Sequence, residues 1–210
     1  EKEVFSYQAG KLVSYSEIEK ARTYEDKYTV GYNDRQIKVS WKDDSDSKVC
    51  TYSLDENGFV TSVLLTTIED EDTWNTYYTF EYNMTQTYLI KITEKYDGEK
   101  PTTTKIEWNE GDASSFTRDG NKHTYIYTSV NNKGGILPLD NGWLDVDAEL
   151  QIAYYAGILG KPTKHLVASR SSSNQLGYQE TFQYKLDAEG YVEYFTTDYR
   201  EEFPHKYTFK

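Results

Sequence analysis

Two related stretches of sequence decide the fold: YSLDENGFVTSV, which begins at Tyr52, and YKLDAEGYVEYF, which begins at Tyr184. In each stretch an aspartate, Asp55 or Asp187, stands three residues before a glycine. This spacing is typical of a type I turn that is closed by a residue in the left-handed region. The aspartate carboxylate can accept hydrogen bonds from the turn amides, and glycine adopts positive φ without steric cost. The sequence therefore predicts two copies of one β-hairpin.

Looser copies of this hairpin occur elsewhere in the chain. FSYQAGKLVSY begins at Phe5, FEYNMTQTYLIKIT at Phe80 and IEWNEGDASSFT at Ile106. A unit that is repeated at irregular spacing favours neighbouring hairpins in an antiparallel meander over a solenoid of strict period.

Alternation assigns the two faces of the predicted strands. Residues Tyr78, Phe80 and Tyr82 fall on one side of their strand, and Tyr77, Thr79 and Glu81 fall on the other. The same parity places Cys50 with apolar neighbours. We therefore expect a sheet with one apolar and one wet face, and a buried Cys50.

A helical period interrupts this pattern near the C-terminal third of the chain. Leu144, Ala148, Ile152, Tyr155 and Leu159 follow one another at intervals of three or four residues, which is the helical spacing. A glycine and a proline just beyond this run form a stop signal. The sequence predicts one amphipathic helix near residues 145–159.

These elements together predict an all-β-dominated fold. A sheet with one apolar face must cover that face, and the predicted helix is the one element available for this. We expect an antiparallel meander of repeated hairpins that forms a strongly curled sheet or partial barrel around the helix. The 210 residues are predicted to form a single domain, residues 1–210.

Composition excludes several classes of function. The net charge of −12 and the lack of clustered Lys and Arg argue against nucleic acid as a partner. The single cysteine cannot form an intramolecular disulfide. No apolar stretch approaches the length of about 20 residues that a membrane helix needs, and we do not expect the chain to span a membrane.

The hairpin units, the segment AELQIAYYAGILGKPTKHL from Ala148 and the terminal YTFK together carry a family resemblance. The chain resembles the Bacteroidetes domain of unknown function with a porin-like fold, over essentially its whole length. The resemblance implies a secreted protein or lipoprotein of the bacterial envelope, in the periplasm or at the outer-membrane or cell surface. A signal segment and a lipid-bearing cysteine would then precede the domain. The predicted outer faces carry Thr, Lys, Glu and Gln rather than an apolar band, so we expect no membrane barrel.

The sequence contains no recognisable catalytic or metal-binding motif, and we predict no catalytic, cofactor or metal-ligand residue. The three histidines, His123, His165 and His205, have no metal-ligand spacing, and the serines 171–173 lack a nucleophile elbow. Asp43, Asp44 and Asp46 do not complete a calcium loop. We expect no enzyme.

Aromatic residues are the best candidates for contact with a ligand, because the chain holds 21 Tyr and 4 Trp. Tryptophan can stack on sugar rings or other flat apolar faces, which makes Trp41, Trp74, Trp108 and Trp143 the candidate ligand-binding residues, although core packing is the alternative for each. We expect a non-enzymatic module of the bacterial envelope that binds a glycan or a small apolar ligand. The alternative is a structural or protein-interaction domain of a surface assembly, with an envelope protein as partner.

Overall fold

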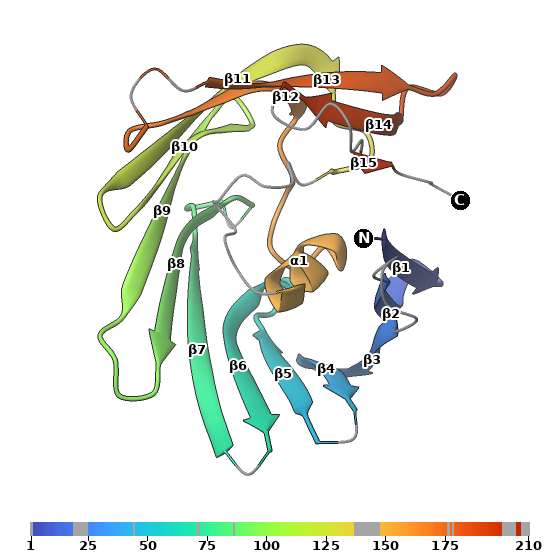
Figure 1. Ribbon diagram of the computed structural model, residues 1–210, viewed down its shortest axis with the longest axis vertical. Helices are drawn as coiled ribbons and strands as arrows, with labels where there is room; N and C mark the ends of the chain where they lie inside the picture. The colour runs from blue at the N-terminus through green and yellow to red at the C-terminus, as the bar shows by residue number, and fades with distance from the viewer. Residues whose placement is uncertain are drawn as a thin grey trace. The chain divides into compact units, whose positions relative to one another are not determined.

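The computed structural model describes residues 2–18, 25–43, 45–70, 72–85, 87–136, 148–175, 177, 179–198 and 205–206 (Figure 1). The first eight strands are β1 (Lys2–Gln8), β2 (Lys11–Ile18), β3 (Glu25–Asn33), β4 (Gln36–Lys42), β5 (Ser47–Leu54), β6 (Val60–Glu69), β7 (Asp72–Tyr82) and β8 (Leu89–Tyr96). They are followed by β9 (Thr102–Asn109), β10 (Asp112–Arg118), β11 (Asn121–Asn131), the helix α1 (Ala148–Tyr155), β12 (His165–Ser172), β13 (Gln179–Leu186), β14 (Val192–Thr197) and β15 (His205–Lys206).

The order of the strands in the sheet follows their order in the sequence, from β1 to β15. The strand pairs whose register the structure defines are antiparallel, as in the hairpins β4–β5 and β5–β6. Because β1 and β15 are the two ends of this order, the sheet is open. The predicted all-β antiparallel meander with one helix is confirmed.

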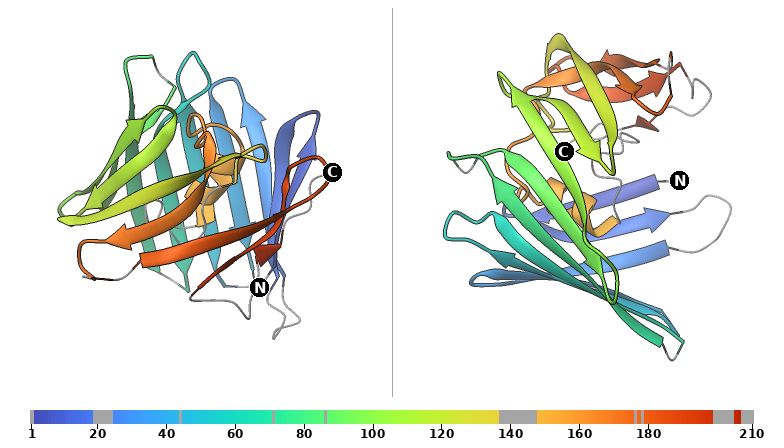
Figure 2. Two further views of the ribbon diagram at one scale, coloured as in Figure 1. Left: turned by 90° about the horizontal axis from the view of Figure 1, so that it is seen from above. Right: turned by 90° about the vertical axis from the view of Figure 1, so that its left-hand side faces the viewer.

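The chain divides into two compact units, which are described separately. Unit 1 comprises Glu1–Thr103 and Val146–Gly160, and unit 2 comprises Thr104–Asp145 and Lys161–Lys210. Within unit 1 the strands β1–β8 curl around α1, which lies on one face of the sheet (Figures 1 and 2). The Tyr7 hydroxyl of β1 donates to the carbonyl of Tyr155 at 3.1 Å, and the Tyr82 hydroxyl of β7 lies 3.4 Å from the carbonyl oxygen of Ile158. Strands far apart in the sheet therefore both contact the helical segment.

The two D-x-x-G turns have the same hydrogen bonds. Asp55 Oδ1 accepts from the backbone N–H groups of Asn57 and Phe59, each at 2.9 Å. Asp187 Oδ1 accepts from the equivalent groups of Glu189 and Tyr191, again at 2.9 Å. Both turn glycines have a φ of 84°. The sequence repeat is therefore a repeat of structure, as predicted.

The predicted strand faces are confirmed by burial. Tyr78 and Phe80 are buried, whereas Tyr77 is 43% exposed. Cys50 is buried and forms no disulfide. The core of unit 1 is formed by side chains from the strands and from α1, among them Leu12, Tyr15, Ile37, Val39, Cys50, Tyr52, Val63, Leu65, Tyr78, Phe80, Leu150, Ile152 and Ala153.

The helix ends earlier than predicted. Its last residue is Tyr155, and the N–H of Gly157 bonds the carbonyl of Tyr154 while the N–H of Ile158 bonds that of Ala153. With Gly157 at a φ of 76°, these bonds form a Schellman C-cap. The predicted stop, Gly160, has another role: a Cβ there would lie 2.9 Å from the carbonyl oxygen of Thr87. The predicted start of the helix lies outside the described residues, which resume at residue 148.

Unit 2 has its own apolar cluster. Ile136, Leu166 and Val192 are buried together, with Tyr184 and Leu186 packed against them. The rings of Phe182 and Phe195 lie 5.9 Å apart on adjacent strands. This cluster joins the long β11–β12 connection to the β13–β14 hairpin.

Candidate functional site

A row of side chains crosses four strands of unit 1 and contains two of the predicted tryptophans. In the strand register Trp41 of β4 lies opposite Lys48 of β5, Lys48 opposite Thr67 of β6, and Thr67 opposite Trp74 of β7. Residues directly opposite each other on antiparallel strands point to the same face. We call these four residues the tryptophan row.

The tryptophan row belongs to the core face of the sheet. Two residues further from the hairpin turns, the parallel row of Val39, Cys50, Leu65 and Thr76 is buried. In the tryptophan row itself Thr67 is buried, Trp41 and Lys48 are half-buried, and Trp74 is 39% exposed. Along the tryptophan row, the core face of the sheet is therefore partly exposed.

The position of Trp41 is fixed by a run of packed aromatic rings. Its ring lies 6.4 Å from that of Tyr28, with an interplanar angle of 30°. Tyr28 lies 5.3 Å from Tyr15, and Tyr15 lies 4.9 Å from Phe5. These rings belong to β1, β2, β3 and β4 in turn. A ring that is held in this way loses little conformational freedom when a ligand stacks on it.

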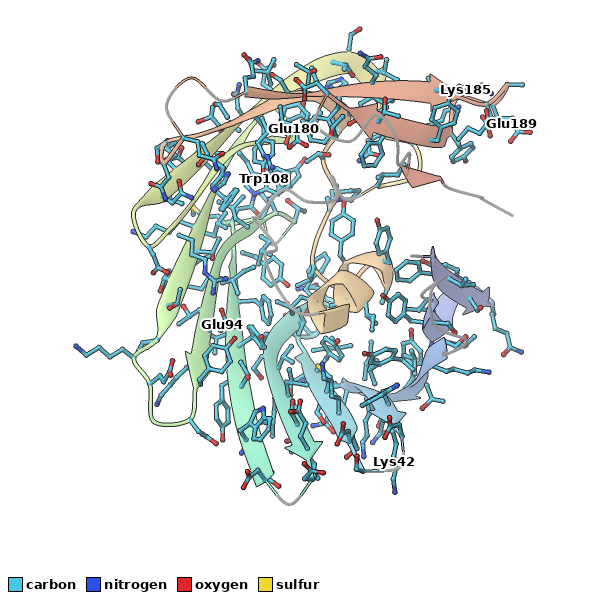
Figure 3. The ribbon with its side chains drawn as sticks, viewed as in Figure 1. Lys42, Glu94, Trp108, Glu180, Lys185 and Glu189 are labelled. Carbon is cyan, nitrogen blue, oxygen red and sulfur yellow. The ribbon has the colours of Figure 1, made fainter. Side chains whose placement is uncertain are left out.

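Acidic turns border the row. The β4–β5 turn contains Asp43 and Asp46, and the β6–β7 turn contains Asp70. Asp46 Oδ1 accepts a hydrogen bond from the backbone N–H of Asp70 at 3.3 Å, so the two turns are tied together. Lys42, at the end of β4, marks this end of the sheet in Figure 3. Carboxylates and an ammonium group, that of Lys48, therefore lie in and beside the row.

The opposite end of the same face is closed by the helical segment. The N–H of Val60, at the start of β6, donates to the carbonyl of Ile158 at 3.0 Å. The Tyr82 hydroxyl, at the end of β7, donates to the carbonyl of Val60 at 2.9 Å. Burial raises the pKa of this hydroxyl well above its ordinary value. The tryptophan row thus lies at the other end of β6 and β7 from Ile158.

One of the other two predicted tryptophans lies in unit 2. Trp108 of β9 lies opposite Ala113 of β10 in unit 2 and is half-buried, and it is labelled in Figure 3. Trp143 lies outside the described residues. The structure therefore places Trp41 and Trp74 in one row on the same face of the sheet, and their role as ligand contacts stays a prediction.

Unit 2 contains a buried ion pair that the sequence did not reveal. The Arg170 guanidinium of β12 lies 2.7 Å from Glu180 Oε2 of β13, and the two side chains are 14% and 2% exposed. Tyr125 of β11 lies opposite Arg170 and shares a side-chain hydrogen bond with it. Burial raises the pKa of the Tyr125 hydroxyl well above its ordinary value. These three side chains lie on β11, β12 and β13 and so link three neighbouring strands of unit 2.

A histidine–carboxylate pair joins β10 to β12. His165 Nδ1 lies 2.7 Å from Asp112 Oδ2, and the backbone N–H of His165 donates to Asp112 Oδ1 at 2.8 Å. The sequence gives no sign of this pair, because its two residues are 53 positions apart. Across the part of the chain that the structure describes, no group of three or more His, Cys, Asp or Glu side chains is arranged to hold a metal.

The chain is similar in fold to solved proteins, whereas no curated protein matches it. A solved porin-like protein from Bacteroides uniformis ATCC 8492 is similar over 97% of this chain and 86% of its own, with 24% identity and a TM-score of 0.73. A porin-like protein from Bacteroides vulgatus ATCC 8482 is similar over 90% and 87%, with 14% identity and a TM-score of 0.54.

Among the described residues no helix has the length and apolarity needed to cross a bilayer. Residues 5–194 match the model of the domain of unknown function (DUF4595) with porin-like fold. The chain, through that match and the fold it shares with the Bacteroides structures, belongs to this porin-like family.

Proposed function

We propose that this protein is a non-enzymatic ligand-binding module of the bacterial envelope, which takes a glycan or a small apolar ligand on the tryptophan row. The observation that carries the proposal is the row itself. It combines an exposed Trp74, a Trp41 held by stacking on Tyr28, and a lysine between them. Flat rings with a few polar groups beside them are the usual composition of a small-molecule site.

The proposed envelope location is supported by the family match and by the two similar solved structures. The family is described as porin-like, and the two similar solved structures are porin-like proteins of Bacteroides.

A thermal-shift screen of glycans and small apolar compounds, with calcium included, tests the proposal. A ligand present at 100 times its Kd adds about 2.7 kcal/mol to the native state. For a chain of this size that corresponds to a rise of roughly 5–10 °C in Tm. The rise should disappear in Trp74→Ala. The matched control is Tyr77→Ala, which removes a similarly exposed aromatic ring from the other face of β7 and should keep the rise.

The proposal fails if no compound raises Tm, or if the rise is the same in Trp74→Ala as in the native chain. One observation favours a second function, a protein-interaction domain. Leu64 of β6 and Tyr77 of β7 lie directly opposite each other on the outer face and are 39% and 43% exposed. If Tyr77→Ala, rather than Trp74→Ala, abolishes binding to an envelope partner, this second function is supported.

A further inference from the structure

The outer face of strands β4–β8 is basic, although the chain has a net charge of −12. This face of unit 1 points away from α1 (Figure 1). Side chains alternate between the two faces of a strand. All five strands are described, and at their outward positions Glu81 is the one acidic residue. The basic residues at these positions are Lys38, Lys42, Lys91 and Lys95.

One of these lysines is neutralised within the face. Lys91 Nζ lies 2.6 Å from Glu81 Oε1 on the neighbouring strand. The remaining lysines, which belong to β4 and β8, leave a positive charge on this face. Because the chain as a whole is acidic, the outer face differs in sign from the rest of the molecule.

One row of the outer face combines two lysines with exposed apolar side chains. Its members, in order across the sheet, are Lys38 (β4), Thr51 (β5), Leu64 (β6), Tyr77 (β7) and Lys95 (β8). We call these five residues the lysine row. Both lysines are exposed, as are Leu64 and Tyr77 between them. The row therefore has an apolar centre and a cation at each end.

The dimensions of this surface are those of a small interface. Strands β4 and β8 are four positions apart in the sheet, which corresponds to roughly 19 Å at about 4.8 Å per step. Ile68, four residues after Leu64 on the same face of β6, is also exposed. It extends the apolar centre by about 13 Å along the strand. A surface of this size is typical of a transient partner.

The chemistry of the surface favours a protein partner. Leu64 and Ile68 offer branched aliphatic groups, which pack against protein side chains, whereas sugar rings stack on flat aromatic faces. An apolar centre with charged groups at its rim is the usual anatomy of a protein interface.

The charge of the surface favours an acidic partner. Charges at the rim attract surfaces of opposite sign and repel surfaces of the same sign. The net charge of −12 repels an acidic protein from the chain as a whole. The attraction is therefore concentrated at the outer face, which orients such a partner on the lysine row.

We propose that the lysine row is the docking surface for another protein, whose own surface is acidic around an apolar centre. The inference rests on the second function above, protein interaction, and narrows the partner to an acidic one. It does not depend on the tryptophan row, which lies on the core face of the sheet.

An NMR titration of the ¹⁵N-labelled chain tests the proposal. The probe is a random copolymer of glutamate and tyrosine, which presents carboxylates and apolar rings. Amide signals of β4–β8 should shift when it is added. Polyglutamate, which has no rings, should bind more weakly. Affinity for the copolymer should fall by roughly tenfold or more between about 0.05 and 0.5 M salt, because salt screens exposed charges.

Charge reversal separates a local effect from a global one. Lys38→Glu combined with Lys95→Glu should lower the affinity for the copolymer by about tenfold or more. The matched control is Lys161→Glu combined with Lys164→Glu. These two lysines are exposed in the segment before β12, and their reversal changes the net charge by the same amount. The control should keep the affinity within about twofold.

The apolar centre is tested by Leu64→Thr combined with Tyr77→Thr. Threonine has a high strand propensity, so these changes suit the sheet. Affinity for the copolymer should fall to the value for polyglutamate. A dispersed amide spectrum shows that each variant is folded, and Tyr77→Thr alone replaces the double variant if that variant does not fold.

Several results would overturn the proposal. Among them are no shifts in β4–β8, an equal loss in the two charge-reversal variants, and unchanged affinity in the threonine variant. Tighter binding of polygalacturonate to the same residues would assign the face to an acidic glycan. Self-association in sedimentation experiments that Lys38→Glu and Lys95→Glu abolish would assign it to a second copy.

The failure of this inference is distinguishable from the failure of either proposed function. If a copolymer of lysine and tyrosine shifts the same outer-face amides equally, protein interaction stands and the acidic partner is wrong. A rise in Tm that requires Trp74 tests the tryptophan row by itself, and it should be unchanged by Lys38→Glu and Lys95→Glu.

Discussion

Gly160→Ala should destabilise unit 1 more than any other glycine substitution in a turn of that unit. Gly160 has a φ of 88°, and an added Cβ would lie 2.9 Å from the Thr87 carbonyl oxygen and 3.4 Å from Tyr82 Cε1. The positive φ costs an alanine about 1–2 kcal/mol. Contact with a backbone oxygen that cannot rotate away adds an overpacking cost of about 1–3 kcal/mol. We expect a loss of roughly 2–5 kcal/mol in the free energy of unfolding.

Gly58→Ala is the matched control. Gly58 lies in the same unit at a φ of 84°, and a Cβ there would meet no atom within 4 Å. Its substitution should cost only the conformational part, about 1–2 kcal/mol. Urea unfolding of both variants, followed by tryptophan fluorescence, measures the difference. If both variants lose the same stability, the close approach of Gly160 to the β7–β8 turn contributes nothing and the reasoning is wrong. Ligand binding should be retained in both, because neither glycine contacts the tryptophan row.

Three further predictions concern other parts of the fold. Asp187→Ala removes the acceptor of two turn amides and should cost about 1 kcal/mol in urea unfolding, whereas Asp187→Asn should keep most of this stability; equal losses would contradict the role of the side-chain oxygen. Arg170→Met leaves Glu180 buried without its partner and should cost about 3–5 kcal/mol, while the double substitution with Glu180→Leu should cost much less; a double variant as unstable as the single one would exclude this explanation. The hydrogen bond from Ser115, aided by Lys122, lowers the pKa of the Glu107 carboxyl below its ordinary value. A lowered pKa in the folded state stabilises the fold above the ordinary pKa of the carboxyl, and this contribution is lost as the pH falls through the folded value. In an NMR titration Ser115→Ala should raise the Glu107 pKa, and an unchanged value would show that the hydroxyl is not the main cause.

Local chemistry explains which parts of the fold could be predicted. The D-x-x-G turns are encoded within five residues, because Asp55 and Asp187 bond amides of their own turns. Alternation likewise assigns Tyr78 and Phe80 to the core without knowledge of the partner strand. These features depend on neighbours in sequence, and the sequence predicted them correctly.

The end of the helix shows where local signals become ambiguous. Gly157 and Gly160 lie three residues apart, and both adopt positive φ. The first closes the helix, and the second allows a close approach to Thr87 on another segment. Sequence reasoning chose Gly160 because a proline follows soon after it. The choice between the two depends on a tertiary contact, which no local pattern contains.

The candidate site required information that only the register supplies. Trp41 and Trp74 share a row because three successive strand pairs have the register observed. A slip of one residue in any pair would move one tryptophan to the opposite face. The pair of Arg170 and Glu180 was missed for the same reason, since nothing in either segment states which residues lie opposite each other. The sequence could indicate tryptophan as a residue type that contacts ligands, but it could not show that Trp41 and Trp74 share a row.

The sequential order of the strands also has a consequence for how the protein is made. Each strand pairs with the strand that precedes it in the chain, so the sheet can grow one hairpin at a time at small loop-closure cost. The contact of α1 with β1 is different, because Tyr7 and Tyr155 are separated by 148 residues. During synthesis from the N-terminus, strands β1–β8 can assemble while the helix that covers their core face has not yet been made. For that interval the nascent sheet exposes apolar surface that is covered only when residues 148–160 have been made.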